Sequence, residues 1–202
     1  MNQTNALPLM EDFYTIQGEG AFSGVPAYFL RLGGCDVGCV WCDVKDSWDA
    51  SKHPLVTIQE MVDRVVATPA EIAVITGGEP LIYNLDTLTS ALKEKGIRTH
   101  IETSGAYPLS GKWDWICVSP KKFKSPLEKI YDKAHELKVI VYNKSDFLWA
   151  REFAEKVNPN CILLLQPEWS KSAEILPSII EFVKENPKWR ISLQTHKFMD
   201  IP

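Results

Sequence analysis

The sequence predicts an α/β fold built around a mainly parallel sheet. Short apolar segments alternate along the chain with amphipathic ones, and polar or glycine-rich turns follow the apolar segments. Strand–helix–strand alternation implies right-handed crossovers and parallel pairing. The chain has 202 residues. The sheet is therefore either a doubly wound open sheet or an incomplete (β/α) barrel, because eight complete units usually need about 250 residues.

The expected strands are short apolar runs, each bounded by polar or glycine-rich turns. They span residues 27–32, 72–75, 99–102, 115–118, 137–141, 162–166 and 190–193. We find no internal repeat and no long linker, so we expect a single domain over residues 1–202.

The expected helices carry apolar residues at helical spacing. They span residues 57–67, 84–95, 145–157 and 175–185. Thr57 and Glu60 form a capping box at the start of the first helix. Asn84 is expected to cap the second helix, which Gly96 ends, and Ser145 is expected to cap the third.

The composition is that of an ordinary globular protein and excludes several classes. Asp and Glu number 26 against 22 Lys and Arg, and a net charge of −4 argues against a protein that coats nucleic acid. The longest apolar run covers residues 161–165, whereas a membrane span needs about 20 residues. No Lys or Arg precedes Arg31, so the positive start of a signal peptide is missing. We expect a cytoplasmic protein.

Three of the five cysteines lie within eight residues, as Cys35, Cys39 and Cys42. A structural zinc site usually closes with four ligands. No fourth Cys or His follows within a few residues, and His53 is the nearest. Three thiolates suit a 4Fe-4S cluster better, because they leave one iron free to bind a small molecule. Cys117 and Cys161 fall inside expected strands and are expected to be small buried hydrophobic residues.

Chemically useful side chains follow the expected strands. Because the carboxyl ends of parallel strands meet at one edge of the sheet, these turns are expected to form one site. They are the cysteine triplet, Gly77-Gly78-Glu79, Glu102-Thr103-Ser104, Ser119-Pro120-Lys121, Gln166-Pro167 and Gln194-Thr195-His196. The remaining histidines, His53, His100 and His135, are expected at the surface or as hydrogen-bonded core residues.

The spacing C-x3-C-x2-C, followed by a strand that ends in Gly-Gly-Glu-Pro, resembles the radical S-adenosylmethionine (SAM) superfamily. The resemblance implies that the open iron binds the amino and carboxylate groups of SAM. One electron from the cluster then cleaves SAM to methionine and a 5′-deoxyadenosyl radical, which abstracts hydrogen from the substrate. The reactive chemistry belongs to the cofactor, so no side chain is expected to act as a conventional catalytic group.

Further blocks extend the resemblance to the 7-carboxy-7-deazaguanine synthase family. These blocks are residues 13–20 (FYTIQGEG), 42–43 (CD), 101–105 (IETSG), 118–121 (VSPK), 137–139 (LKV), 165–167 (LQP), 189–197 (WRISLQTHK) and 201–202 (IP).

This resemblance covers nearly the whole chain and implies an incomplete (β/α) barrel of about six parallel strands. It implies a homodimeric lyase that converts 6-carboxy-5,6,7,8-tetrahydropterin to 7-carboxy-7-deazaguanine with loss of ammonia, on the route to deazapurines such as queuosine. A one-electron donor such as flavodoxin or ferredoxin is the expected partner, with no nucleic acid and no membrane.

The resemblance also implies ligand-binding residues. Those expected to contact substrate are Ile16, Gln17, Gly18, Glu19, Arg31, Thr76 and Pro202. Those expected to contact SAM are Gly78, Glu79, Glu102, Ser119, Pro120, Lys121, Gln166, Pro167, Glu168 and Trp169. For the glycine turn, the physical expectation is that its amide groups approach a ligand carboxylate.

One residue departs from the family pattern. Family members often have threonine after Cys-Asp, and its hydroxyl binds a Mg²⁺ ion that bridges to the substrate carboxylate. This chain has Cys42-Asp43-Val44, and valine offers no side-chain oxygen. Mg²⁺ is still expected, with Asp43 as the candidate protein ligand.

Two alternatives share part of the pattern. Another small radical enzyme, such as an activase that places a glycyl radical on a partner protein, would have the triplet and the glycine turn. It should lack Gln17, Arg31 and the Gln-Thr-His-Lys tail. A non-catalytic iron–sulfur protein would not need the glycine turn.

Overall fold

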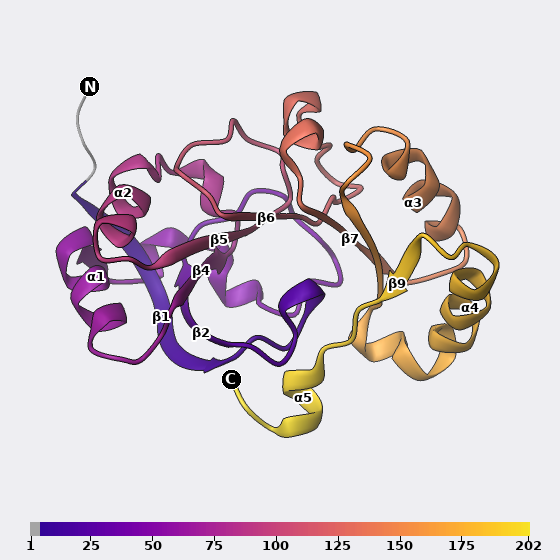
Figure 1. Ribbon diagram of the computed structural model, residues 1–202, viewed down its shortest axis with the longest axis horizontal. Helices are drawn as coiled ribbons and strands as arrows, with labels where there is room; N and C mark the ends of the chain where they lie inside the picture. The colour runs from indigo at the N-terminus through magenta and orange to yellow at the C-terminus, as the bar shows by residue number, and fades with distance from the viewer. Residues whose placement is uncertain (1–4) are drawn as a thin grey trace.

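The computed structural model describes residues 5–202 and shows one curved sheet with helices on its outer side (Figure 1). The nine strands lie in the order β3-β1-β2-β4-β5-β6-β7-β8-β9. Seven strands pair in parallel, in the order β2-β4-β5-β6-β7-β8-β9. Strand β1 pairs antiparallel with both β2 and β3. The strands are β1 (Ala6–Ile16), β2 (Pro26–Leu32), β3 (Leu55–Thr57), β4 (Ile72–Gly77), β5 (Arg98–Thr103), β6 (Trp115–Val118), β7 (Glu136–Val141), β8 (Ile162–Pro167) and β9 (Trp189–Ile191).

This arrangement confirms the expected incomplete barrel. All seven expected strands form, and all of them belong to the parallel part of the sheet. Strands β1 and β3 were not expected from the sequence. Strand β1 lacks clean alternation, contains Pro8 and changes register between Leu9 and Glu11, so its sequence pattern is weak.

The helices are α1 (Ile58–Val66), α2 (Asp86–Glu94), α3 (Asp146–Ala154), α4 (Ser172–Glu185) and α5 (Thr195–Met199). Short 3-10 turns are η1 (Gly20–Phe22), η2 (Lys45–Trp48), η3 (Ala50–Lys52), η4 (Pro80–Ile82), η5 (Glu128–Lys133) and η6 (Trp169–Lys171). Helices α1 to α4 cover the outer side of the sheet, whereas α5 lies at its open side (Figure 1). In the part of the chain that is described, no helix has the length and apolarity to cross a membrane.

The helix starts test the expected caps. The Thr57 hydroxyl accepts from the Glu60 amide at 3.2 Å, as expected. Asn84 is not the cap of α2: Leu85 holds that position, and the Asn84 side chain accepts from the Asp86 amide in a local turn. Ser145 holds the cap position of α3 but makes no capping hydrogen bond.

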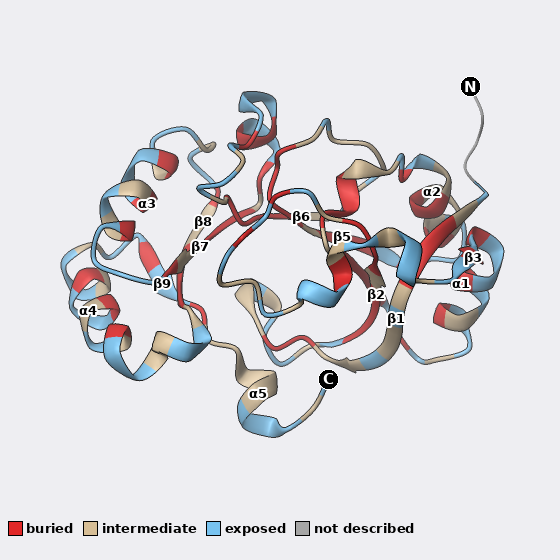
Figure 2. Ribbon diagram, turned by 180° about the vertical axis from the view of Figure 1, so that it is seen from behind, coloured by how far each residue is buried: buried red, intermediate tan, exposed pale blue. Residues whose placement is uncertain are grey.

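Buried residues follow the strands of the sheet and recur along the helices (Figure 2). Strand alternation divides the buried side chains into two sets. Outward residues such as Leu30, Ile75 and Leu137 pack under the helices in the main core. Inward residues at the amino ends of the strands, such as Phe29 and Val74, pack in a second, smaller cluster with Phe22 of η1. The inner face is therefore apolar at one end, which leaves the other end for polar groups.

His100 and Trp115 lie beside Phe22 on this inner face, with ring centroids 4.5 Å and 4.9 Å from the Phe22 ring. The buried His100 Nε2 and Trp115 Nε1 atoms have no hydrogen-bond partner among the described residues. The expectation that His100 is hydrogen-bonded through its ring is therefore wrong for Nε2. Burial lowers the pKa of His100 to about 4, with a further contribution from the charge of Arg98.

Candidate active site

Five of the parallel strands present a polar side chain on the inner face, in the middle of the strand or near its carboxyl end. Side chains along a strand point alternately to its two faces, so residues two positions apart share a face. Each of these polar residues therefore lies on the same face as the inward residue two positions before it. They are Arg31 of β2, Thr76 of β4, Glu102 of β5, Lys138 of β7 and Gln166 of β8. All five line one cavity of about 240 Å³.

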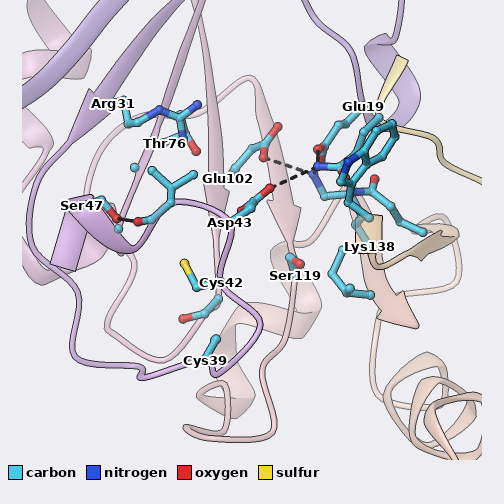
Figure 3. Close-up of a pocket in the computed structure, with 18 of the residues that line it drawn as sticks. Glu19, Arg31, Cys39, Cys42, Asp43, Ser47, Thr76, Glu102, Ser119 and Lys138 are labelled. Atoms are coloured by element: carbon cyan, nitrogen blue, oxygen red, sulfur yellow. Dashed lines mark hydrogen bonds and ion pairs between the residues drawn. The ribbon is translucent and has the colours of Figure 1, made fainter. Parts of the chain in front are cut away.

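The cavity gathers the residues that the sequence indicated. All seven expected substrate residues line it, as do the three clustered cysteines and Asp43. Eight of the ten expected SAM residues also line it, and Glu79 and Pro120 do not. In the view of Figure 3, Cys42 lies below Asp43, while Arg31 and Thr76 flank one side and Glu19 and Lys138 the other.

The cysteine loop is held against the ends of β2 and β4. The Gly34 amide donates to the Ser47 carbonyl at 2.6 Å, and the Cys35 amide donates to the Trp48 carbonyl at 3.1 Å. Gly34 has a φ of 104°, in the left-handed region that favours glycine. These contacts turn the loop back toward the sheet, so that its thiols face the cavity.

The thiols fit a 4Fe-4S cluster. Burial raises the pKa of Cys35, and it raises the pKa of Cys39 to about 11, so binding to iron would have to deprotonate these two thiols. Within residues 5–202, no three Cys, His, Asp or Glu side chains lie close enough to hold one metal ion. A cluster makes a different demand, because each thiolate binds a different iron and the sulfurs lie farther apart.

The glycine turn packs loops together. A β-carbon at Gly78 would lie 2.2 Å from the Gly34 carbonyl oxygen and 2.7 Å from the Cys35 β-carbon. The Gly78 amide donates to the Leu32 carbonyl, and the Glu79 amide donates to the Gly34 carbonyl. We expected these amides to approach a ligand carboxylate. Instead, the two amides donate to carbonyl groups at the end of β2 and in the cysteine loop.

Glu79 is buried, with 1% of its surface exposed. Its carboxylate accepts from the Leu81 amide, the Thr103 hydroxyl, and both the amide and the hydroxyl of Ser104. These contacts tie the turn after β4 to the turn after β5. The carboxylate is thus used within the protein, which explains why Glu79 does not line the cavity.

A hydrogen-bonded chain runs along the opposite flank. Gln17 Nε2 donates to Glu102 Oε1 at 3.0 Å, and Lys138 Nζ lies 3.1 Å from Glu102 Oε2. Lys138 also pairs with Glu19 Oε2, and Gln194 Nε2 donates to Glu19 Oε1 at 2.9 Å. Burial by itself raises the pKa of Glu19, but Lys138 and the amide donors outweigh it and lower the pKa to about 2.

Helix α5 closes the cavity from the carboxyl-terminal side. The Thr195 amide donates to the Gly18 carbonyl at 2.8 Å, and the Thr195 hydroxyl donates to the same oxygen at 3.0 Å. A β-carbon at Gly18 would lie 2.3 Å from His196 Nδ1. His196 and Pro202 both line the cavity, so the tail forms part of its wall.

Several lining residues were not indicated by the sequence, notably Lys138, Ser47 and Trp41, whereas Gln194 and His196 of the expected tail turn do line the cavity. The hydroxyl of Ser47 donates to the Val44 carbonyl at 2.6 Å. Alternation along β7 would have placed Lys138 on the same face as Glu136, but only knowledge of which face is inward shows that this is the cavity side.

Arg31 and Asp43 both have protein partners. Arg31 Nε pairs with Glu11 Oε1 at 2.6 Å. The Asp43 carboxylate lies 3.4 Å from Gln194 Nε2 and 3.4 Å from Lys197 Nζ. Both side chains line the cavity, so a ligand would add to these contacts or replace them.

Known proteins share this arrangement. Residues 30–142 match the radical SAM superfamily. The chain is 58% identical over 196 residues to the 7-carboxy-7-deazaguanine synthase of Flavobacterium psychrophilum, covering 97% of this chain and 93% of the relative. It is 47% identical over 198 residues to that of Synechocystis sp., covering 98% and 95%. The crystal structure of QueE from Escherichia coli matches with a TM-score of 0.85 at 31% identity, covering 93% of both chains.

The superfamily implies a 4Fe-4S cluster and SAM as cofactors. These relatives do not favour a glycyl-radical activase or a non-catalytic iron–sulfur protein. The agreement extends over nearly the whole chain. The chain therefore belongs to the 7-carboxy-7-deazaguanine synthase family of radical SAM enzymes.

Proposed function

We propose that this protein converts 6-carboxy-5,6,7,8-tetrahydropterin to 7-carboxy-7-deazaguanine with loss of ammonia. One observation carries the proposal: three cysteines and the polar groups of Gln17 and Arg31 line the same cavity. The substrate is flat, has amide-type donors and acceptors on one edge, and carries a carboxylate. Such a molecule requires an amide-type partner for its edge, which Gln17 offers, and a cation for its carboxylate, which Arg31 offers. Family membership supports the same reaction.

Cys35, Cys39 and Cys42 would hold the cluster. Bound and reduced, the cluster would supply the electron for cleavage of SAM, and the radical chemistry at substrate C6 would come from these cofactors. The residues proposed to orient SAM lie at the carboxyl ends of four strands or on the turns that follow them. They are Gly78, Glu102, Ser119, Lys121, Gln166, Pro167, Glu168 and Trp169, with Glu79 and Pro120 supporting their turns.

The chain's own groups would bind the substrate from both sides of the cavity. Arg31 would donate to the substrate carboxylate, and Gln17 and Glu19 would pair with the pterin edge. Ile16, Gly18, Thr76 and Pro202 would complete the contact surface. Helix α5 would exclude water from the radical, because it covers the cavity beside Gly18.

Mg²⁺ belongs to the proposal as a bridge to the substrate carboxylate. Asp43 lines the cavity with a carboxylate that protein donors contact only at 3.4 Å, so it could take a metal. The Val44 side chain could not. A site with one carboxylate and substrate or water oxygens is usual for Mg²⁺, which keeps several waters.

The cellular setting follows from the same chemistry. Three reduced thiols and a low-potential cluster require a reducing compartment, and we propose that the enzyme works in the cytoplasm as a single-domain protein that forms a homodimer. A one-electron donor such as flavodoxin or ferredoxin would reduce the cluster. The product would enter 7-deazapurine synthesis, including the route to queuosine.

The test is an anaerobic assay of the reconstituted protein. The protein, with iron and sulfide restored, receives a reductant, SAM and the pterin, with or without Mg²⁺, and mass spectrometry detects the product. We expect 7-carboxy-7-deazaguanine from the unchanged protein and none from Cys39→Ala. Cleavage of SAM without this product would show that the substrate is wrong, and an intact cluster with no cleavage would reject the reaction altogether.

A further inference from the structure

Lys138 is a buried cation in the wall of the cavity. It lies in the middle of β7, between Glu136 and Ile140 on the inner face, and only 3% of its surface is exposed. Removing an ammonium group from water is costly unless it is paired and hydrogen-bonded. The partners of Lys138 must therefore compensate for the cost of burying its charge.

The partners of Lys138, and their own partners, come from three other segments of the chain: the loop after β1, strand β5 and the start of α5. Lys138 Nζ contacts Glu19, which follows β1, and Glu102, which is in β5. The second oxygen of Glu19 accepts from Gln194, at the start of α5, and the second oxygen of Glu102 accepts from Gln17. Lys138 thus connects the proposed pterin-binding loop, the sheet and the carboxyl-terminal tail.

The charges of its two carboxylate partners keep Lys138 in its charged form. Burial lowers the pKa of Lys138, but the charges of Glu102 and Glu19 outweigh burial and raise it well above its usual value. Cys117 of β6, Glu136 of β7, Lys121 and His196 are the other titratable groups that influence Lys138 or Glu19. Within the charged trio, two carboxylates share one ammonium, so loss of Lys138 would leave two negative charges facing each other.

We propose that Lys138 is a positioning residue that fixes Glu19 for substrate and Glu102 for SAM and, through Glu19 and Gln194, holds α5 closed over the cavity. This inference rests on the proposed function for its substrate. Its effect on the tail does not depend on which substrate binds. A lysine that served only stability would weaken the whole fold without changing the tail or the binding site selectively.

The first experiment uses the reconstituted holoenzyme and 6-carboxypterin, a fluorescent oxidised analogue that cannot turn over. In Lys138→Met, we expect the dissociation constant of this analogue to rise about tenfold or more, because charge-assisted contacts are lost. Lys138→Arg should recover part of the affinity. Lys93→Met, which removes an ion pair to Asp114 outside the cavity, is the matched control and should bind normally.

The pH dependence of that binding gives a second readout. Without the lysine, Glu19 and Glu102 repel each other, and one of them takes up a proton at a higher pH. The acid limit of analogue binding should therefore move upward by about one unit or more in Lys138→Met. Lys138→Arg should stay close to the unchanged protein.

Hydrogen exchange at the tail is the readout that needs no substrate. The amides of Thr195 and Ile201, which donate to the Gly18 and His196 carbonyls, should exchange faster in Lys138→Met, while β4 and β5 keep their protection. If Lys138→Met does not fold, Glu19→Gln and Lys138→Arg carry the same test, with faster tail exchange expected only in Glu19→Gln.

Unchanged analogue affinity together with unchanged tail exchange in Lys138→Met would overturn the proposal, as would uniform loss of protection throughout the sheet. Failure of the unchanged holoenzyme to bind the analogue or to make the product would instead reject the proposed function. The exchange experiment would still decide whether Lys138 holds the tail.

Discussion

Gly18 shows how closely the tail packs against the loop after β1. A β-carbon there would lie 2.3 Å from His196 Nδ1 and 2.7 Å from the His196 backbone nitrogen. Because one of these atoms belongs to the main chain, a rotamer change of His196 cannot relieve the contact. The residue at position 18 therefore determines whether α5 can dock.

Gly18→Ala should displace α5 and weaken pterin binding. We expect a loss of about 1–3 kcal/mol in the free energy of unfolding, typical of overpacking, and a higher KM with a smaller change in kcat. Denaturant unfolding and steady-state kinetics measure both. Gly24→Ala is the control: it has a φ of 90° but no atom within 4 Å of its new β-carbon. It should cost about 1 kcal/mol of backbone strain and leave KM unchanged.

Glu79→Gln tests whether this buried carboxylate is structural. The amide NH₂ would replace one of the two acceptor oxygens, so it would face either the Leu81 and Thr103 donors or the two Ser104 donors. We expect a loss of about 2–4 kcal/mol in the free energy of unfolding, because charged, buried hydrogen bonds are broken. Glu94→Gln, at an exposed position of α2, should change it by less than about 0.5 kcal/mol. Equal stability of the two variants would contradict a structural role.

At the scale of the elements, three loops meet around the cysteines. Tyr107 Oη donates to Asp36 Oδ2 at 2.5 Å, and Lys124 Nζ lies 2.8 Å from the same oxygen and 2.7 Å from Tyr107 Oη. Asp36 belongs to the cysteine loop, Tyr107 follows β5, and Lys124 follows β6. This clasp, formed by Asp36, Tyr107 and Lys124, holds the cysteine loop from its outer side.

Opening the clasp should weaken retention of the cluster. In Tyr107→Phe combined with Lys124→Met, we expect iron to be lost to a chelator about two- to fivefold faster, the range for exposed ion pairs. The absorbance of the reconstituted cluster reports this loss under anaerobic conditions. Lys133→Met, at an exposed position of η5, is the control. Identical rates in all three proteins would show that the clasp does not restrain the loop.

Strands and helices could be predicted where their sequence signals lie within the element itself. The parallel strands and α1 follow from apolar runs and a capping box, each contained within a few residues. The cap of α2 was wrong because Asn84 accepts a hydrogen bond within a local turn, and its residue type does not decide between a turn and a cap. Ser145 holds the predicted cap position of α3 but makes no capping hydrogen bond. Strand β1 could not be found, because its pairing with β2 and β3 stabilises it more than its own pattern does.

At the scale of the whole molecule, the site joins regions that the sequence separates. Cysteines, glycine turn and tail were predicted because each has a local motif or a family resemblance. Lys138 was missed because its two carboxylate partners lie 119 and 36 residues away. Long-range pairing of this kind leaves no periodic signal, so only the folded sheet reveals it.

The acid sensitivity of the whole fold should depend on His100. Its folded-state pKa of about 4 lies below the ordinary value of 6.5, so the unfolded chain binds the proton more readily. Stability is therefore fully present above pH 6.5 and falls as the pH approaches 4. At pH 5 the expected loss from this group is about 2 kcal/mol.

His100→Phe removes this titration and the unpartnered Nε2 atom while keeping the ring against Phe22. The free energy of unfolding, measured with urea at pH 7 and pH 5, should fall less in the variant than in the unchanged protein. A parallel fall in both proteins would show that other groups account for the acid loss.

The separation between Glu19 and Gln194 also has a consequence during synthesis of the protein. Their contact spans 175 residues, whereas the three cluster thiols all lie within the first 42 residues. While the chain is being made on the ribosome, the thiols emerge long before the tail that completes their cavity exists. For most of translation they face the surrounding solution, where iron–sulfur delivery and oxidation compete for the same three sulfur atoms.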